Sequence, residues 1–166
     1  MIAVLLAEDQ ALLRGALAEI LDREEDIAVA AQVGRGDEVL AAALRTRPDV
    51  ALIDIEMPGR DGILCTADLR QHVPSCRVLV LTVFNRPGYL RRALESGAQG
   101  YILKDAAPRD LVRAIRSAAT GARVIDPQLA AAALYDGVSP LSPRERQVLA
   151  LTSRGASVGD IAGPGP

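Results

Sequence analysis

The chain has 166 residues, which suffices for one full domain and a small appendage. Its net charge is −2 and its pI is near 5.4, so the overall charge provides no attraction to nucleic acid or to an anionic membrane surface. Two cysteines are too few for a disulfide framework and lack the spacing of a metal site, so we interpret both as reduced thiols. Residues 1–7 have no basic segment and are too short to span a bilayer, which predicts a soluble, cytoplasmic protein without a membrane segment.

Short apolar segments alternate with segments of helical periodicity along most of the chain. The apolar segments show no polar–apolar alternation, which is typical of parallel strands buried on both faces. Such strands are expected at 2–7, 27–33, 50–53, 77–82 and 101–103. The helices that follow them are expected at 11–21, 37–47, 61–73, 87–97 and 108–120. We therefore predict an α/β fold, a five-stranded parallel sheet with flavodoxin-like strand order and helices on both faces.

The interior is expected to be aliphatic, because apolar residues make up 49% of the chain but include no Trp and one Phe. Asp9 is a candidate N-cap for the first helix. In that helix, the predicted apolar face comprises Leu12, Leu13, Ala16, Leu17, Ile20 and Leu21. In the helix that Asp37 begins, the predicted inward residues are Val39, Leu40, Ala43 and Leu44.

The chain after residue 122 has a different character. A further Ala-rich helix is expected over 126–135. Residues 142–145 then combine an N-cap Ser, a Pro at the first helical position and a Glu that completes a capping box. We predict three parts: the α/β domain at 1–122, a linker helix and linker at 123–140, and a short all-helical segment with a disordered tail at 141–166.

Polar side chains follow four of the predicted strands at the point where each strand ends. Glu8 and Asp9 follow the first strand, Asp54 the third and Lys104 the fifth, while Thr82 ends the fourth. Because parallel strands end at the same edge of a sheet, we expect these side chains to lie close together. Three neighbouring carboxylates repel one another and require a cation, and all-oxygen ligands suit Mg²⁺.

This set of residues has the chemistry of a phosphoryl acceptor. A carboxylate such as Asp54 can attack phosphorus and hold an acyl phosphate. The transfer itself needs mostly positioning and charge neutralisation, which Mg²⁺, the Lys104 ammonium and the Thr82 hydroxyl can provide, with the main-chain carbonyl of Glu56 as a further metal ligand. Each residue alone also has an ordinary structural interpretation, as a helix cap, a strand-end hydroxyl or a solvated lysine. Their occurrence together after successive strands favours a joint site.

This combination resembles the receiver domain of response regulators, which has a CheY-like fold. The resemblance covers residues 1 to about 122 and is carried by Glu8-Asp9, Asp54, Met57-Pro58-Gly59, Gly62, Thr82, Tyr101 and Lys104. It implies that Asp54 accepts a phosphoryl group from a sensor histidine kinase, with Glu8, Asp9 and the Glu56 carbonyl around Mg²⁺. It also implies that Thr82 and Tyr101 form a switch pair. Phosphorylation is then expected to promote a homodimer, either through helices one and five or through helix four, strand five and helix five.

Shorter resemblances concern the output of the protein. Residues 141–149 are similar to the opening of the NarL/LuxR (FixJ)-type helix-turn-helix domain, which implies transcriptional control. Residues 84–89, together with 55–59, are similar to DesR-type regulators of membrane-lipid desaturation. The sequence ends before a recognition helix, so we expect this form to have no DNA-binding residues and a complete form to bind DNA.

Two departures from the receiver pattern stand beside the site. Asp105 follows Lys104 at a position where receivers often carry proline. Val83 follows Thr82 and is larger than the alanine often found there. We expect Val83 to restrict access to the phosphoryl group and so to slow its turnover.

Two other classes of function compete with the transcriptional switch. A stand-alone receiver could act as a phosphate sink or as a competing dimer partner without DNA binding. A haloacid-dehalogenase-type phosphatase also uses an aspartate nucleophile with Mg²⁺, but it requires a second aspartate two residues after the nucleophile, where this chain has Glu56. We therefore predict a phosphoacceptor signalling protein rather than an enzyme.

Overall fold

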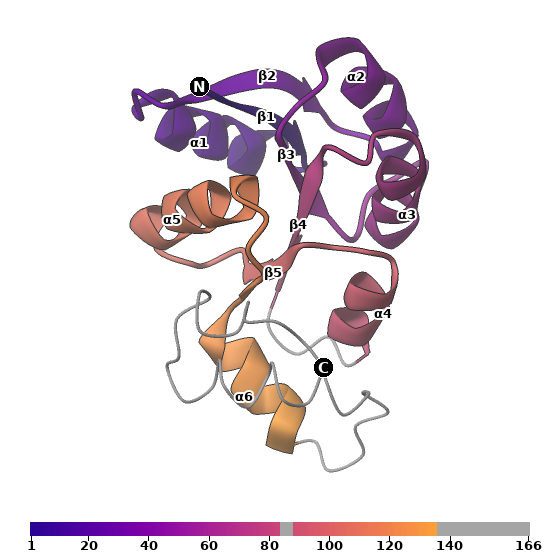
Figure 1. The fold of residues 1–166 in the computed structure, drawn as a ribbon, viewed down its shortest axis with the longest axis vertical. Coiled ribbons are helices and arrows are strands. Elements are labelled where there is room, and N and C mark those ends of the chain that lie inside the picture. Colours follow the sequence, from indigo (N-terminus) through magenta and orange to yellow (C-terminus); the bar gives the residue numbers. More distant parts are fainter. Residues whose placement is uncertain (84–87, 136–166) are drawn as a thin grey trace.

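The computed structural model of the chain describes residues 1–83 and 88–135. Within these residues, six parallel strands form one sheet in the order β2-β1-β3-β4-β5-β6. The sheet passes through the middle of the molecule, between two layers of helices (Figure 1). The strands are β1 (Ile2–Ala7), β2 (Ile27–Val33), β3 (Val50–Asp54), β4 (Arg77–Thr82), β5 (Gly100–Leu103) and β6 (Val124–Ile125).

Helices α1 and α5 cover one face of the sheet, and α2, α3 and α4 cover the other (Figure 1). A short 3-10 turn, η1 (Gly36–Glu38), leads into α2. The helices are α1 (Ala11–Asp22), α2 (Val39–Thr46), α3 (Gly62–His72), α4 (Tyr89–Glu95), α5 (Pro108–Ala119) and α6 (Pro127–Tyr135). None of the helices in the described part of the chain is both long and apolar enough to cross a membrane.

The predicted α/β fold is confirmed, with five parallel strands in flavodoxin-like order. The sequence did not predict β6, which extends the sheet by two residues beside β5. Tyr101 pairs with Ile125 in this ladder, and the Asp126 N–H donates to the Tyr101 carbonyl at 3.0 Å. A two-residue strand has no periodicity to detect, and it forms here because α5 returns the chain to the open edge of β5.

Four local predictions are wrong, and one of them is the burial of Ala16, which is exposed on α1. Asp9 does not cap α1; Gln10 occupies the N-cap position without a side-chain hydrogen bond. Leu12 is 89% exposed because α1 buries only a narrow stripe along Leu17 and its helical neighbours, and Leu12 lies outside that stripe. Leu44 of α2 is 43% exposed for the same reason, since Val39, Ala42 and Ala43 form the buried side of that helix.

The helix ends follow their local signals. The Asp61 carboxylate caps α3 by accepting a hydrogen bond from the Ile63 N–H at 2.6 Å, and Pro108 occupies the first turn of α5. Gly97, the predicted left-handed cap after α4, has a φ of 98°. The predicted role of Pro87 and the predicted helical segment at 141–166 lie outside the described residues.

The core consists of two aliphatic clusters, one on each face of the sheet. Leu5, Leu52 and Leu79 in the strands have no exposed surface. Burying a side chain of this size contributes about 2 kcal/mol before conformational entropy is counted. Burial also raises the pKa of the free thiols, to about 11 for Cys65 and about 12 for Cys76, which keeps both protonated at neutral pH.

Candidate functional site

Three charged side chains meet where β1, β3 and β5 end. Glu8 follows β1, Asp54 is the last residue of β3, and Lys104 follows β5. The Lys104 Nζ lies 3.0 Å from Glu8 Oε2 and 3.1 Å from Asp54 Oδ2. Glu8 is only 1% exposed and Asp54 only 3%. Parallel pairing of β3 with β1 and β4, and of β4 with β5, brings these strand ends to one edge of the sheet.

A third carboxylate completes an acidic cluster. One carboxylate oxygen from each of Glu8, Asp9 and Asp54 lies within 4.8 Å of the other two. In the described part of the chain, Glu8 Oε2 is the one buried side-chain oxygen or nitrogen without a hydrogen bond, although Lys104 lies within ion-pair distance of it. A buried carboxylate oxygen that lies beside two further carboxylates fits a hard cation, and this donor set suits Mg²⁺.

The charges in this cluster depend on one another. Burial, together with the neighbouring Glu8 carboxylate, raises the pKa of Asp54 to about 7, and Lys104 acts in the opposite direction. Burial acts to lower the pKa of Lys104, but the hydrogen bonds that its ammonium donates to the Glu8 and Asp54 carboxylates, and the attraction to their charges, outweigh burial, so the pKa of Lys104 is raised. The ammonium therefore stays charged at neutral pH, while Asp54 without a metal ion is close to its midpoint.

Main-chain groups hold the two buried carboxylates in place. Glu8 Oε1 accepts a hydrogen bond from the Gln10 N–H at 3.1 Å, and Asp54 Oδ1 accepts one from the Glu56 N–H at 3.3 Å. Arg14 donates to the Glu8 carbonyl at 2.6 Å from the next turn of α1. The contact of Arg14 could not be predicted from the sequence, since a single arginine in an amphipathic helix carries no signal for it.

A small hollow opens beside Asp54. It is lined by Asp54, Ile55, Glu56, Thr82, Val83, Tyr89 and Lys104. The Thr82 hydroxyl donates to the Val83 carbonyl at 3.2 Å, and Val83 is 47% exposed at the rim. The hollow therefore gives a small ligand access to a carboxylate that is otherwise buried.

Tyr101 lies in the sheet below this hollow. It is 2% exposed and shares a side-chain hydrogen bond with Thr82. Burial, which outweighs this hydrogen bond, raises the pKa of Tyr101 to about 12. The side chains of Thr82 and Tyr101 thus lie close to each other, and their role as a switch pair stays a prediction.

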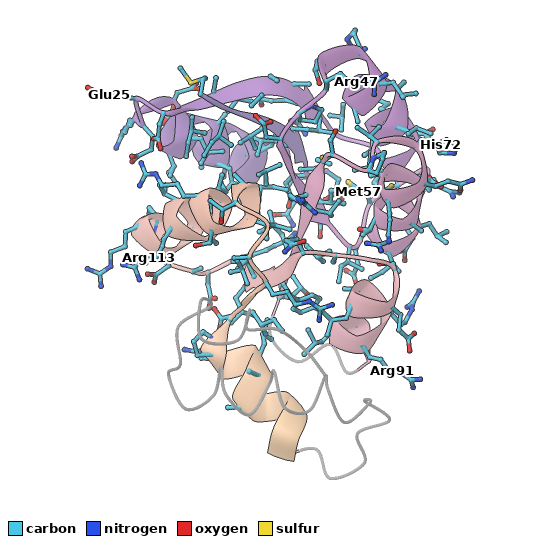
Figure 2. All side chains as sticks on the ribbon, in the orientation of Figure 1. Glu25, Arg47, Met57, His72, Arg91 and Arg113 are labelled. Atoms are coloured by element: carbon cyan, nitrogen blue, oxygen red, sulfur yellow. The ribbon has the colours of Figure 1, made fainter. Side chains whose placement is uncertain are left out.

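The structure brings Glu8, Asp9, Asp54 and Lys104 together at one edge, with Thr82 in the adjoining hollow. The side chain of Glu56 is exposed, and the role of its carbonyl stays a prediction. His72, at the end of α3, points out from the surface of the molecule, far from this edge (Figure 2).

The sequence matches the response regulator receiver domain family over residues 4–116, a span that includes the whole cluster. The chain belongs to this family. It is 44% identical over 161 residues to the uncharacterized transcriptional regulatory protein YvfU of Bacillus subtilis (strain 168), covering 97% of this chain and 80% of that protein. It is 39% identical over 162 residues to the transcriptional regulatory protein DesR of the same organism, covering 98% of this chain and 80% of DesR.

A solved structure extends the likeness of this receiver-domain protein to its fold. The crystal structure of a LuxR-family two-component response regulator from Aurantimonas sp. SI85-9A1 matches with a TM-score of 0.72 at 26% identity, covering 93% of this chain and 99% of that chain. The predicted resemblance to NarL/LuxR-type regulators, including DesR, is confirmed. The protein is a two-component response regulator of this family, and response regulators are signalling proteins.

Proposed function

We propose that a sensor histidine kinase phosphorylates Asp54 in a Mg²⁺-dependent reaction and that this modification switches the protein. The observation that carries the proposal is the buried contact of Asp54 with Glu8 and Lys104 beside an open hollow. A purely structural ion pair needs neither a third carboxylate within 4.8 Å nor access for a ligand. Both features suit a carboxylate that reacts with a phosphoryl group.

Each residue of the site has a separate proposed role in phosphoryl transfer. A carboxylate oxygen of Asp54 attacks the phosphorus of the kinase phosphohistidine, and the imidazole nitrogen leaves with the electrons of the broken P–N bond. Glu8, Asp9 and Asp54 would hold Mg²⁺, with the Glu56 carbonyl as a further ligand, and the bound ion neutralises charge on the transferred group. Lys104, 3.1 Å from Asp54, can pair with a phosphoryl oxygen.

Thr82 and Tyr101 are the proposed link to the output. The Thr82 hydroxyl now donates to a neighbouring carbonyl, and a phosphoryl group on Asp54 offers it a more strongly charged acceptor. Because Tyr101 is hydrogen-bonded to Thr82, a movement of Thr82 changes the packing of Tyr101 in β5. The proposed result is a homodimer with transcriptional output. The names of YvfU and DesR describe those relatives as transcriptional regulatory proteins.

Incubation with acetyl phosphate tests the chemistry. The wild-type protein should gain the mass of one phosphoryl group in Mg²⁺ but not in EDTA, and Asp54→Asn should gain none. Asp49→Asn, at the opposite end of β3, is a matched control and should react like the wild type. Equal modification of Asp54→Asn, or modification in EDTA, would contradict the proposal. Rapid turnover of acetyl phosphate without an adduct would indicate a phosphatase instead.

Light scattering tests the proposed dimer. Phosphorylated wild-type protein should show twice the monomer mass, whereas Asp54→Asn treated in the same way should remain monomeric. A wild-type mass that does not respond to phosphorylation would contradict the proposed change in assembly while leaving the phosphoacceptor chemistry intact.

A further inference from the structure

The β3–α3 loop, residues 55–61, begins directly after the phosphoacceptor and carries the proposed carbonyl ligand. Its far end is held by α3. The Gly62 N–H donates to the Ile55 carbonyl at 2.8 Å, and a Cβ on Gly62 would collide with the main-chain oxygen of Asp54. The loop therefore returns tightly over the end of β3.

The same loop is held from the opposite side by Gly36, in the β2–α2 connection. The Gly36 N–H donates to the Pro58 carbonyl at 2.9 Å. The Cys65 thiol of α3 donates to the Gly36 carbonyl at 3.3 Å, and a Cβ on Gly36 would collide with the Arg60 carbonyl. Gly36 does not have a positive φ, so this position needs glycine for space rather than for a backbone angle.

The residue after Gly36 adds a second contact to the loop. The Asp37 carboxylate, paired with Arg35 at 3.0 Å, lies against Gly59, where a Cβ would stand 2.5 Å from Asp37 Oδ1. Gly59 has a φ of 83°, a conformation that favours glycine. Within the loop, Met57 is 9% exposed and belongs to the core cluster that includes residues of α3. The loop is thus packed between the β2–α2 turn and the core.

We propose that Gly36 is a positioning residue for the metal site. It acts through the main chain of Pro58 and Arg60, and so sets where the loop presents the Glu56 carbonyl. The inference rests on the proposed function, in which that carbonyl is a Mg²⁺ ligand. Gly36 forms hydrogen bonds with Pro58 and Cys65, whereas Glu8 and Asp54 are held by the N–H groups of Gln10 and Glu56, so a side chain at position 36 would displace the loop and leave the carboxylates in place.

A Mg²⁺ titration of Gly36→Ala tests the proposal. Groups that orient metal ligands typically change metal affinity by about 10- to 100-fold when they are altered. We expect the Mg²⁺ concentration for half-maximal phosphorylation by acetyl phosphate to rise about tenfold. The rate at saturating Mg²⁺ should stay close to that of the wild type, and calorimetry should report the same loss of affinity.

Gly15→Ala is the matched control, because a Cβ at this position in α1 meets no atom within 4 Å. It should bind Mg²⁺ like the wild type. An unchanged half-saturating concentration in Gly36→Ala would overturn the inference, and so would a rate loss that saturating Mg²⁺ does not restore. A wild-type protein that binds no Mg²⁺ would contradict the proposed function instead.

Hydrogen exchange in the wild-type protein keeps the inference testable if Gly36→Ala does not fold. Coupling between two sites is reciprocal, so a contact that raises Mg²⁺ affinity is itself stabilised by Mg²⁺. Mg²⁺ should slow exchange of the Gly36 amide more than exchange of the Gln99 amide, which donates to Val78 at the other end of the sheet. An equal effect on both amides would overturn the inference.

Discussion

Two networks in this protein each place one cation between two carboxylates. Lys104 lies 3.0 Å from Glu8 and 3.1 Å from Asp54, and Arg116 of α5 lies 2.8 Å from each of two acids in residues 24–26. The distances are alike, but the surroundings differ. The Lys104 side chain is 15% exposed and its partners 1% and 5%, whereas that of Arg116 is 45% exposed and its partners 34% and 49%.

Burial reverses the effect of the network on its aspartate. In the exposed network, the hydrogen bond from Arg116 lowers the pKa of Asp26. In the buried network, loss of water raises the pKa of Asp54 to about 7 despite the contact with Lys104. Water screens the charges of the exposed Arg116 network, whereas in the buried Lys104 network the charge of each group depends on its neighbours. Ion-pair distances alone therefore do not distinguish a surface contact from a reactive site.

Removal of the buried cation should have the largest effect. Lys104→Met leaves two buried carboxylates without their counter-charge, a change that costs about 3–5 kcal/mol of unfolding free energy in comparable cases. Urea unfolding in EDTA above pH 7, followed by circular dichroism because the chain has no Trp, measures this loss. A loss of unfolding free energy no greater than that of Arg116→Met would contradict the difference between the buried and the exposed network.

The pH dependence of stability should differ between the two aspartates. The pKa of Asp54 is about 7 in the folded protein and 3.8 in the reference state, so the folded state binds more protons between these values. Unfolding free energy in EDTA should therefore fall as pH rises through this range. Asp54→Asn should remove that part of the slope, as urea midpoints across the range would show. An identical slope in wild type and Asp54→Asn would contradict the raised pKa.

The strands and the site edge were predictable because both depend on local patterns. An apolar run such as 50–53 specifies a buried strand, and a charged residue directly after it specifies the strand end. The exposure of Leu12 and the short strand β6 were not predictable, because each depends on which surface the rest of the chain covers.

The support of the site escaped prediction for a related reason. Glu8, rather than Asp9, accepts the main-chain hydrogen bond at the start of α1, which leaves Asp9 exposed next to the cluster. The close approach of Gly36 to the Arg60 carbonyl joins two loops that are distant in sequence. Neither contact could be inferred from the sequence, because an acidic residue before a helix and a glycine in a turn are common in many contexts.

A smaller effect is expected from the access of water to the phosphoryl group on Asp54. Val83 lines the hollow beside Asp54, and Val83→Ala should open it. If the barrier to hydrolysis falls by about 0.4 kcal/mol, the phosphoryl group should be lost about twofold faster. The decay of the phosphorylated mass after removal of the phosphodonor measures this rate. An unchanged lifetime would mean that Val83 does not control access.

The smallest effect is expected in the exposed network. Arg116→Ala should leave the urea midpoint nearly unchanged, because exposed ion pairs contribute little to stability. Any difference from the wild type should vanish at high salt, where surface charges are screened. A loss of unfolding free energy that is independent of salt and comparable with that of Lys104→Met would contradict the claim. It would show that exposure does not determine how much each network contributes to stability.

The most direct test of the central claim is a calorimetric titration of the metal-free protein with Mg²⁺. We predict one bound ion per chain, held by Glu8, Asp9 and Asp54, and binding that is lost in Asp9→Asn. Affinity should also weaken as pH falls through about 7, because a proton on Asp54 competes with the metal. Absence of binding, or binding that neither pH nor Asp9→Asn alters, would contradict the assignment of this cluster as a metal-dependent phosphoacceptor site.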